Sequence, residues 1–229
     1  MTRSLLTRSN AKTPKGERRG WITWILYLAP ANLSGYEVCG GRSKDCTALC
    51  LYTAGRGQMN SVQQARIRKT KWFFEDRSGF MEQLAREVKR CIAYAKKKGM
   101  KPAFRLNGTS DIPWESIRVG DHKNIFEMFP SVQWYDYTKL IGRKKIPKNY
   151  HLTYSRSEAN EQDIVKALKR GMNISVVFDR LPDQYMNLPV IDGDQDDLRF
   201  LDPRERVVGL VAKGKAIKSI HSNFVIRSH

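Results

Sequence analysis

Apolar residues recur along the chain in two different patterns. Short unbroken apolar runs bounded by turn residues indicate buried strands, and apolar positions three and four apart indicate helices that pack on a core. The runs predict five strands, over residues 21–29, 102–107, 132–138, 150–155 and 173–178. Between them the pattern changes to the helical period, so the order strand, helix, strand is expected to repeat.

The clearest helical pattern covers residues 78–98. Its apolar face is formed by Phe80, Leu84, Val88, Cys91, Ile92 and Ala95. Gly99 follows and is expected to end this helix, because glycine accepts the left-handed conformation found after helix ends. Helical periodicity begins near Ser61, a shorter helix is expected over 121–129, and another is expected to begin at 160–163 and to end at Gly171.

This alternation predicts an α/β fold, either a partial (β/α) barrel or an open, mostly parallel sheet with flanking helices. The link at 139–149 is too short for more than one helical turn. The chain is expected to divide into a basic flexible arm (1–20), an α/β core that contains a cysteine-bearing loop (21–178), and a C-terminal extension packed on the core (179–229). Residues 198–201 and 207–211 are expected to add edge strands, making this extension a small β element.

Charge adds a hypothesis about partners. The chain has 229 residues, with 41 Lys plus Arg against 23 Asp plus Glu, for a net charge of +18. Such an excess favours a polyanionic partner, most simply nucleic acid. The basic clusters lie at 12–19, 66–71, 96–101 and 143–148. The longest apolar run is too short to span a bilayer and the N-terminus lacks a signal core, so a cytoplasmic protein with no membrane partner is expected.

Three cysteines fall within one glycine-containing loop, at Cys39, Cys46 and Cys50. Thiolates at such spacing can bind one soft metal centre, and three of them leave one coordination position open for chemistry. Cys91 lies instead on the apolar face of the predicted 78–98 helix, where a buried, inert thiol is expected.

Three readings of the cysteine loop remain open. The first is an iron–sulfur centre of the 4Fe-4S type. The second is a structural zinc ion, which needs a fourth ligand such as Asp45, His122 or His151. The third is no metal at all.

Parallel strands place the residues that follow them at one edge of the sheet. The cysteine loop follows the first strand and would share that edge with polar residues from the next strands. Those residues are Asn107, Gly108, Thr109, Ser110, Asp111, Asp136, Thr138, Ser155, Arg156, Ser157 and Asp179. The candidate cofactor-binding residues are Gly108, Thr109, Ser110, Asp111, Ser155 and Ser157. Asp111 is the acidic group expected to receive an amine or a ribose.

A second polar cluster comprises Asp192, Asp194, Asp196, Asp197 and Asp202, with Lys213 and Lys215 after a predicted strand. Clustered carboxylates bind magnesium, and such sites cleave phosphodiesters. One alternative function is therefore a magnesium-dependent nuclease that uses the 192–202 segment. Another is a non-catalytic nucleic-acid-binding protein stabilised by zinc.

The cysteine spacing of six and three, followed by Leu51-Tyr-Thr-Ala-Gly55, resembles the phage gene-product-88-like family. Arg105-Leu-Asn-Gly-Thr-Ser-Asp111 and Tyr135-Asp-Tyr-Thr-Lys139 stand where that family carries further strand ends, so the similarity covers roughly 21–178. The family layout looks like a reduced radical S-adenosylmethionine barrel.

The resemblance implies that Cys39, Cys46 and Cys50 bind three irons of a four-iron cluster, with S-adenosylmethionine as a further candidate cofactor. The spacing departs from the usual radical-enzyme pattern of three and two. The leading hypothesis is an iron–sulfur protein, of radical S-adenosylmethionine-like type, that acts on or near nucleic acid or a nucleotide in the host cytoplasm.

Overall fold

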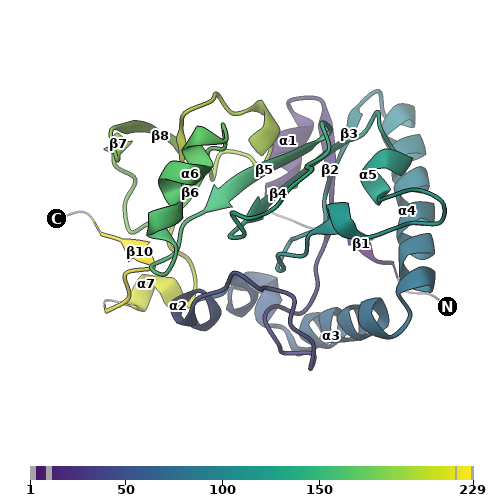
Figure 1. Ribbon diagram of the computed structural model, residues 1–229, viewed down its shortest axis with the longest axis horizontal. Helices are drawn as coiled ribbons and strands as arrows, with labels where there is room; N and C mark the ends of the chain where they lie inside the picture. Colours follow the sequence, from purple (N-terminus) through teal and green to yellow (C-terminus); the bar gives the residue numbers. More distant parts are fainter. Residues whose placement is uncertain (1–3, 9–11, 220, 228–229) are drawn as a thin grey trace.

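The computed structural model describes residues 4–8, 12–219 and 221–227. Its centre is one mixed sheet whose strands follow the order β1-β2-β3-β4-β5-β6-β9-β8-β7, with β10 paired to β6 (Figure 1). The strands are β1 (Leu6–Thr7), β2 (Trp21–Leu26), β3 (Lys101–Arg105), β4 (Gln133–Thr138), β5 (Tyr150–Ser155), β6 (Ile174–Phe178), β7 (Gln184–Tyr185), β8 (Leu188–Asp192), β9 (Val207–Val211) and β10 (Val225–Ile226).

The strands from β2 to β6 lie side by side in chain order, and every pair among them is parallel. Antiparallel pairing occurs where β1 joins β2 and where β7 joins β8. The sheet does not close on itself. The predicted α/β fold with a mostly parallel, open or partly barrel-like sheet is therefore confirmed.

Helices flank this sheet and span its crossover connections. The α-helices are α1 (Thr13–Glu17), α2 (Lys44–Ala48), α3 (Asn60–Glu75), α4 (Arg77–Lys97), α5 (Ile125–Met128), α6 (Ile164–Lys169) and α7 (Lys215–Lys218). Short 3-10 turns are η1 (Leu51–Thr53), η2 (Gly55–Gln58), η3 (Trp114–Ser116), η4 (Glu161–Asp163) and η5 (Arg199–Leu201).

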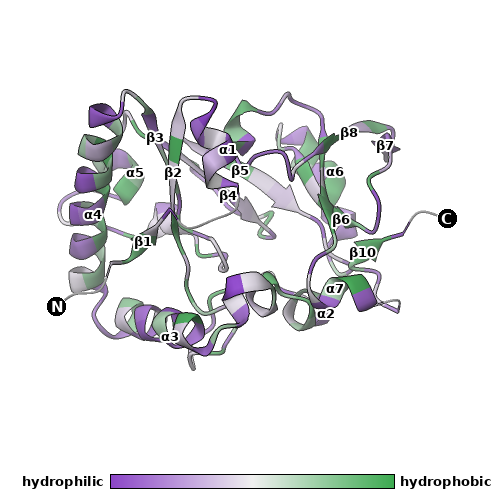
Figure 2. Cartoon of the chain, turned by 180° about the vertical axis from the view of Figure 1, so that it is seen from behind, coloured by the Kyte–Doolittle hydropathy of each residue, from purple (hydrophilic) through white to green (hydrophobic). Residues whose placement is uncertain are grey.

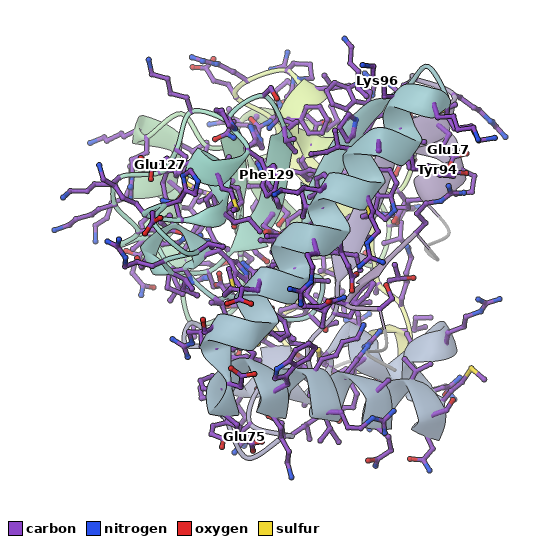
Figure 3. The ribbon with its side chains drawn as sticks, turned by 90° about the vertical axis from the view of Figure 1, so that its right-hand side faces the viewer. Glu17, Glu75, Tyr94, Lys96, Glu127 and Phe129 are labelled. Atoms are coloured by element: carbon purple, nitrogen blue, oxygen red, sulfur yellow. The ribbon has the colours of Figure 1, made fainter. Side chains whose placement is uncertain are left out.

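The long helix α4 covers one flank of the sheet, as the predicted periodicity requires. Phe80, Leu84 and Val88 are fully buried and belong to the main core with residues of β2, β3 and β4. Figure 3 shows α4 crossing the side of the molecule from α3 to the end that carries Tyr94 and Lys96, and Figure 2 shows hydrophilic residues along its outer side. Cys91 is partly buried and packs against this core. Gly99 has φ of +65° and follows the last turn.

The N-terminal segment is attached to the core over residues 4–8. Strand β1 pairs with β2, and the buried carboxylate of Glu87 accepts hydrogen bonds from the backbone N–H groups of Leu5 (2.8 Å) and Leu6 (2.9 Å). Glu87 lies on α4, so the helix holds the strand in place. Of the basic arm expected over 1–20, residues 1–3 and 9–11 lie outside the described part, and the proposed domain boundaries stay a prediction.

Several local expectations were wrong. The 198–201 segment forms no strand, because Arg199–Leu201 is the 3-10 turn η5, and 207–211 form β9 in the interior of the sheet between β6 and β8, not at its edge. The helix expected over 121–129 is reduced to Ile125–Met128. The 139–149 link contains no helix, in agreement with the expectation that it holds no more than one helical turn, and the β4 and β5 strands that it joins are parallel. Among the described residues, no helix is both long and apolar enough to cross a membrane.

Candidate functional site

A cavity of about 1610 Å³ lies at the carboxyl ends of the parallel strands. Residues that end or directly follow β2, β3, β4, β5 and β9 line it, and so do residues of the segment from Cys39 to Lys69. Figure 1 shows α2, α3 and α7 beneath these strand ends, which explains how distant parts of the chain reach one space. Ligand sites of α/β proteins are commonly found at this edge.

All three loop cysteines line this cavity. Cys39 lies in the loop after β2, where its Sγ accepts from the backbone N–H of Ala31 (3.4 Å) and donates to the carbonyl of Thr109 (3.7 Å). Cys46 lies in α2, and its backbone N–H donates to the N-cap hydroxyl of Ser43 (3.0 Å). Cys50 directly precedes η1. The loop therefore holds the cysteines at three successive points along the cavity wall.

Burial keeps these thiols protonated in the absence of a partner. Burial, with a smaller effect from the charges of Cys50 and Cys46, raises the pKa of Cys39 to about 12. Burial also raises the pKa of Cys46 and of Cys50, and Lys139 and Arg66 act in the opposite direction. The three sulfur atoms are near enough to influence one another, so a positive centre among them would favour all three thiolates together.

The described residues contain no group of three His, Cys, Asp or Glu side chains already arranged around a single ion. None of the candidate fourth ligands for zinc lines the cavity. The carboxylate of Asp45 accepts from the Ser222 hydroxyl (2.5 Å), and His151 lines a separate cavity of about 340 Å³. His122 is an exposed residue of an isolated bridge with Val119.

The turn after β3 is built around Asn107. The Asn107 side-chain oxygen accepts from Ser110 Oγ (2.9 Å), from the Ile112 N–H (3.0 Å) and from Trp114 Nε1 (2.9 Å). Within the turn, Gly108 permits a close approach, because a Cβ there would lie 2.6 Å from the Tyr27 ring. The residues from Asn107 to Asp111 all line the cavity, as the order of strands predicted.

Two carboxylates lie beside this turn: Asp136 is buried beneath it, and Asp111 lines the cavity. Asp136 is fully buried beneath it and accepts from the Asn107 N–H (2.9 Å) and the Tyr150 hydroxyl (3.0 Å), and burial raises its pKa to about 6. Asp111 lines the cavity, and its Oδ2 accepts from the Lys139 N–H (2.7 Å). Its buried Oδ1 has no hydrogen-bond partner among the described residues and lies 3.7 Å from Nη1 of Arg143.

The structure separates the two serines predicted after β5. Ser155 lines the cavity and accepts from Nζ of Lys139 (2.8 Å). Ser157 is fully buried, its N–H donates to Asn160 (2.6 Å), and it does not belong to the cavity wall. Asp179 does not line the cavity either, so it is not brought to the predicted site.

Ion pairs engage most of the carboxylates of the acidic 192–202 segment. Asp194 pairs with Lys12 (3.0 Å) and Lys213 (2.6 Å), and Asp196 pairs with Arg19 (2.7 Å). The remaining pairs are Asp197 with Arg105 and Asp202 with Arg199. These carboxylates tie the N-terminal segment and β3 to the C-terminal part of the chain, which is a structural use of the cluster.

Basic side chains of the cavity were not identified from the sequence pattern as site residues. They outnumber the acidic ones in the cavity wall and come from five or more separate segments. They are Arg8, Lys12, Lys15, Arg42, Arg56, Arg66, Lys69, Arg105, Lys139 and Lys213. The helical period of α3 could have placed Arg66 and Lys69 on one face, since residues three apart are neighbours on a helix.

Comparison with known proteins gives one match. No curated protein and no solved structure matches the chain. The match is to the family described as gene product 88, and it covers residues 4–228, which include the cysteine loop, the whole sheet and the C-terminal extension. The chain therefore belongs to the gene product 88 family of phage proteins.

Proposed function

We propose that this chain is an iron–sulfur protein of radical S-adenosylmethionine-like type, acting on nucleic acid or a nucleotide. The observation that carries the proposal is the gathering of Cys39, Cys46 and Cys50 on the wall of one large cavity at the carboxyl ends of the parallel strands. No other described cysteine lines that cavity, since Cys91 packs on α4 against the core.

The chemistry of the donor set fits a four-iron cluster. Sulfur ligands suit iron–sulfur centres, and each thiolate of a cluster binds a different iron, so the sulfurs stand farther apart than around a single zinc ion. All three thiols line one cavity, so they can be offered to one cluster. Lys139 and Arg66 lie near enough to Cys46 and Cys50 to offset part of the thiolate charge.

The chain's own residues would hold the remaining partners. A cluster with one open iron supplies an electron to a bound cofactor such as S-adenosylmethionine. The Oδ1 of Asp111, which has no hydrogen-bond partner among the described residues, can accept from an amine or a ribose hydroxyl, and Ser155 presents its hydroxyl on the wall of the same cavity. Gly108 lets this turn of the cavity wall lie close to Tyr27.

Cysteine variants test the metal centre. Cys46→Ala should lose most of the iron found in the anaerobically purified protein, because one of three thiolates is removed. Cys91→Ala is the matched control, since it deletes the same atom from α4, outside the cavity, and should keep the iron content of the original chain. Equal iron in the two variants would contradict the assignment of the three cysteines.

Asp111→Asn tests the cofactor position separately. An amide has one accepting oxygen where the carboxylate has two, Oδ1 and Oδ2, so binding of S-adenosylmethionine should weaken on the order of tenfold or more. Iron content and the circular dichroism spectrum should stay unchanged. Unaltered binding measured by calorimetry on the iron-loaded protein would remove Asp111 from the proposed site.

A further inference from the structure

The inner face of α3 carries two cations that form no ion pair with an acidic side chain in the described part of the chain. Arg66 and Lys69 lie three residues apart on this helix, and both line the cavity. Other cavity cations have such partners: Lys12 and Lys213 pair with Asp194, and Arg105 pairs with Asp197. The α3 pair therefore contributes positive charge to the cavity wall that no such ion pair offsets.

The Arg66 guanidinium is held in place by an aromatic ring and has hydrogen-bond donors without partners among the described residues. Its guanidinium lies 4.7 Å from the centre of the Tyr27 ring, and this contact fixes the plane of the group. Its Nε and Nη1 atoms are buried and have no hydrogen-bond partner among the described residues. Buried polar groups are normally satisfied, so two open donors on one planar group indicate a missing acceptor.

Lys69 gives the second observation. Its Nζ donates to the carbonyl of Leu5 (2.7 Å), which holds the ammonium at the cavity wall. Burial, opposed by Glu87 and reinforced by the charge of Arg66, lowers the pKa of Lys69 to about 8. An anion between Arg66 and Lys69 would satisfy the open donors and relieve the repulsion between the two cations.

We propose that Arg66 and Lys69 form a binding subsite for a phosphate group. The guanidinium has the fork geometry that matches two phosphate oxygens, and the neighbouring ammonium adds a point charge. The subsite lies beside Cys50, whose thiol is near enough to be influenced by Arg66. This subsite rests on the proposed function for the nature of the reaction. It adds that α3 binds the phosphate-bearing part of the substrate.

The test compares Arg66→Gln with Arg68→Gln in binding assays on the full chain. Arg68 is exposed on the same helix, so the two variants lose the same charge from different faces. The probes are a fluorescein-labelled single-stranded DNA, with inorganic phosphate, a nucleoside monophosphate and a nucleoside triphosphate as competitors. Arg66→Gln should weaken probe binding by on the order of tenfold to a hundredfold, and Arg68→Gln by much less.

Arg66→Lys keeps the charge and removes the fork, so it should fall between the original chain and Arg66→Gln. If the nucleotides displace the labelled DNA, the subsite binds the phosphate of a free nucleotide. If the DNA binds and the nucleotides do not displace it, the subsite binds a phosphodiester of the DNA backbone. Equal losses in Arg66→Gln and Arg68→Gln, or no binding of any probe, would overturn the proposal.

Iron content, measured in the same preparations, separates this proposal from the metal centre. Arg66→Gln should keep its iron, and Cys46→Ala should keep the phosphate subsite. A loss of iron in Arg66→Gln without a loss of phosphate affinity would show that Arg66 serves the cysteines and would refute the subsite. Absence of iron from every variant, with the Arg66 effect intact, would refute the metal centre alone.

Discussion

Single buried polar side chains shape the cavity wall. Asn107 uses one oxygen to hold three donors of the turn after β3, and Asp136 holds the backbone at the start of that turn from below. Each such acceptor satisfies donors that would otherwise be buried without partners. The turn is therefore held by hydrogen bonds to the side chains of Asn107 and Asp136.

His151 is the residue at which pH should act on stability. Burial, with the charge of Arg199 as a smaller cause, lowers the pKa of His151 to about 4 from an ordinary value of 6.5. The unfolded chain then binds a proton at a higher pH than the folded chain does. This contribution to stability is present above about pH 6.5 and is lost as the pH falls towards about 4.

We therefore expect the free energy of unfolding to decrease between pH 6.5 and pH 4 more steeply in the original chain than in His151→Gln. Urea unfolding at several pH values measures the two slopes. His122→Gln is the control, because His122 is exposed in its turn. Parallel slopes for the original chain and His151→Gln would contradict the assignment of a buried neutral imidazole.

At the scale of elements, the N-terminal segment is attached to the core at two places. Glu87 of α4 holds the backbone of Leu5 and Leu6, and the 192–196 loop holds Lys12 and Arg19. Between these anchors, Thr7 and Arg8 line the cavity. The segment is thus part of the cavity wall.

Glu87→Ala should release the first anchor. It leaves two buried backbone donors without their acceptor, which costs about 1–3 kcal/mol of unfolding free energy. Amide exchange at Leu5 and Leu6 should become faster, because the local opening becomes easier. Glu82→Ala, on the exposed side of the same helix, should change neither quantity, and slow exchange in both variants would show that β1 is held by other contacts.

The sequence pattern was most informative for helices and strands whose conformation follows from the local order of apolar and polar residues. The apolar period of 78–98 predicted α4 because one face of that helix meets the core, and the apolar runs predicted β2 to β6. The position of 207–211 inside the sheet depends on pairing with β6 and β8, which no local pattern contains. Leu198-Arg-Phe-Leu201 has a strand-like composition, yet the buried pairs of Arg199 with Asp196 and Asp202 accompany a 3-10 turn.

For the candidate site, strand order brought most of the expected residues together. The rule that parallel strands end at one edge placed the cysteine loop, the 107–111 turn and Ser155 around one cavity. It did not place Ser157, two residues beyond the end of β5, or Asp179, one residue beyond the end of β6, because the strand order does not specify which way a side chain in the following loop points. The cation–π contact that orients Arg66 lies between α3 and the end of β2, and only the fold reveals it.

At the scale of the whole molecule, the net charge of +18 should govern association with nucleic acid. Each phosphate neutralised releases counterions, so affinity falls with salt. If the protein makes about five to eight phosphate contacts, its affinity for single-stranded DNA should fall on the order of a thousandfold between roughly 50 and 200 mM salt. Anisotropy titrations at several salt concentrations measure the slope, and an affinity that does not change with salt would contradict an electrostatic association.

The central claim is that the three cysteines of the cavity hold a four-iron cluster. The most direct test is anaerobic purification of the original chain, followed by iron, sulfide and zinc analysis and a visible absorption spectrum. We expect a coloured protein with about four irons and about four sulfides per chain. A colourless protein that contains zinc, or one that takes up neither metal after reconstitution with iron and sulfide, would contradict it.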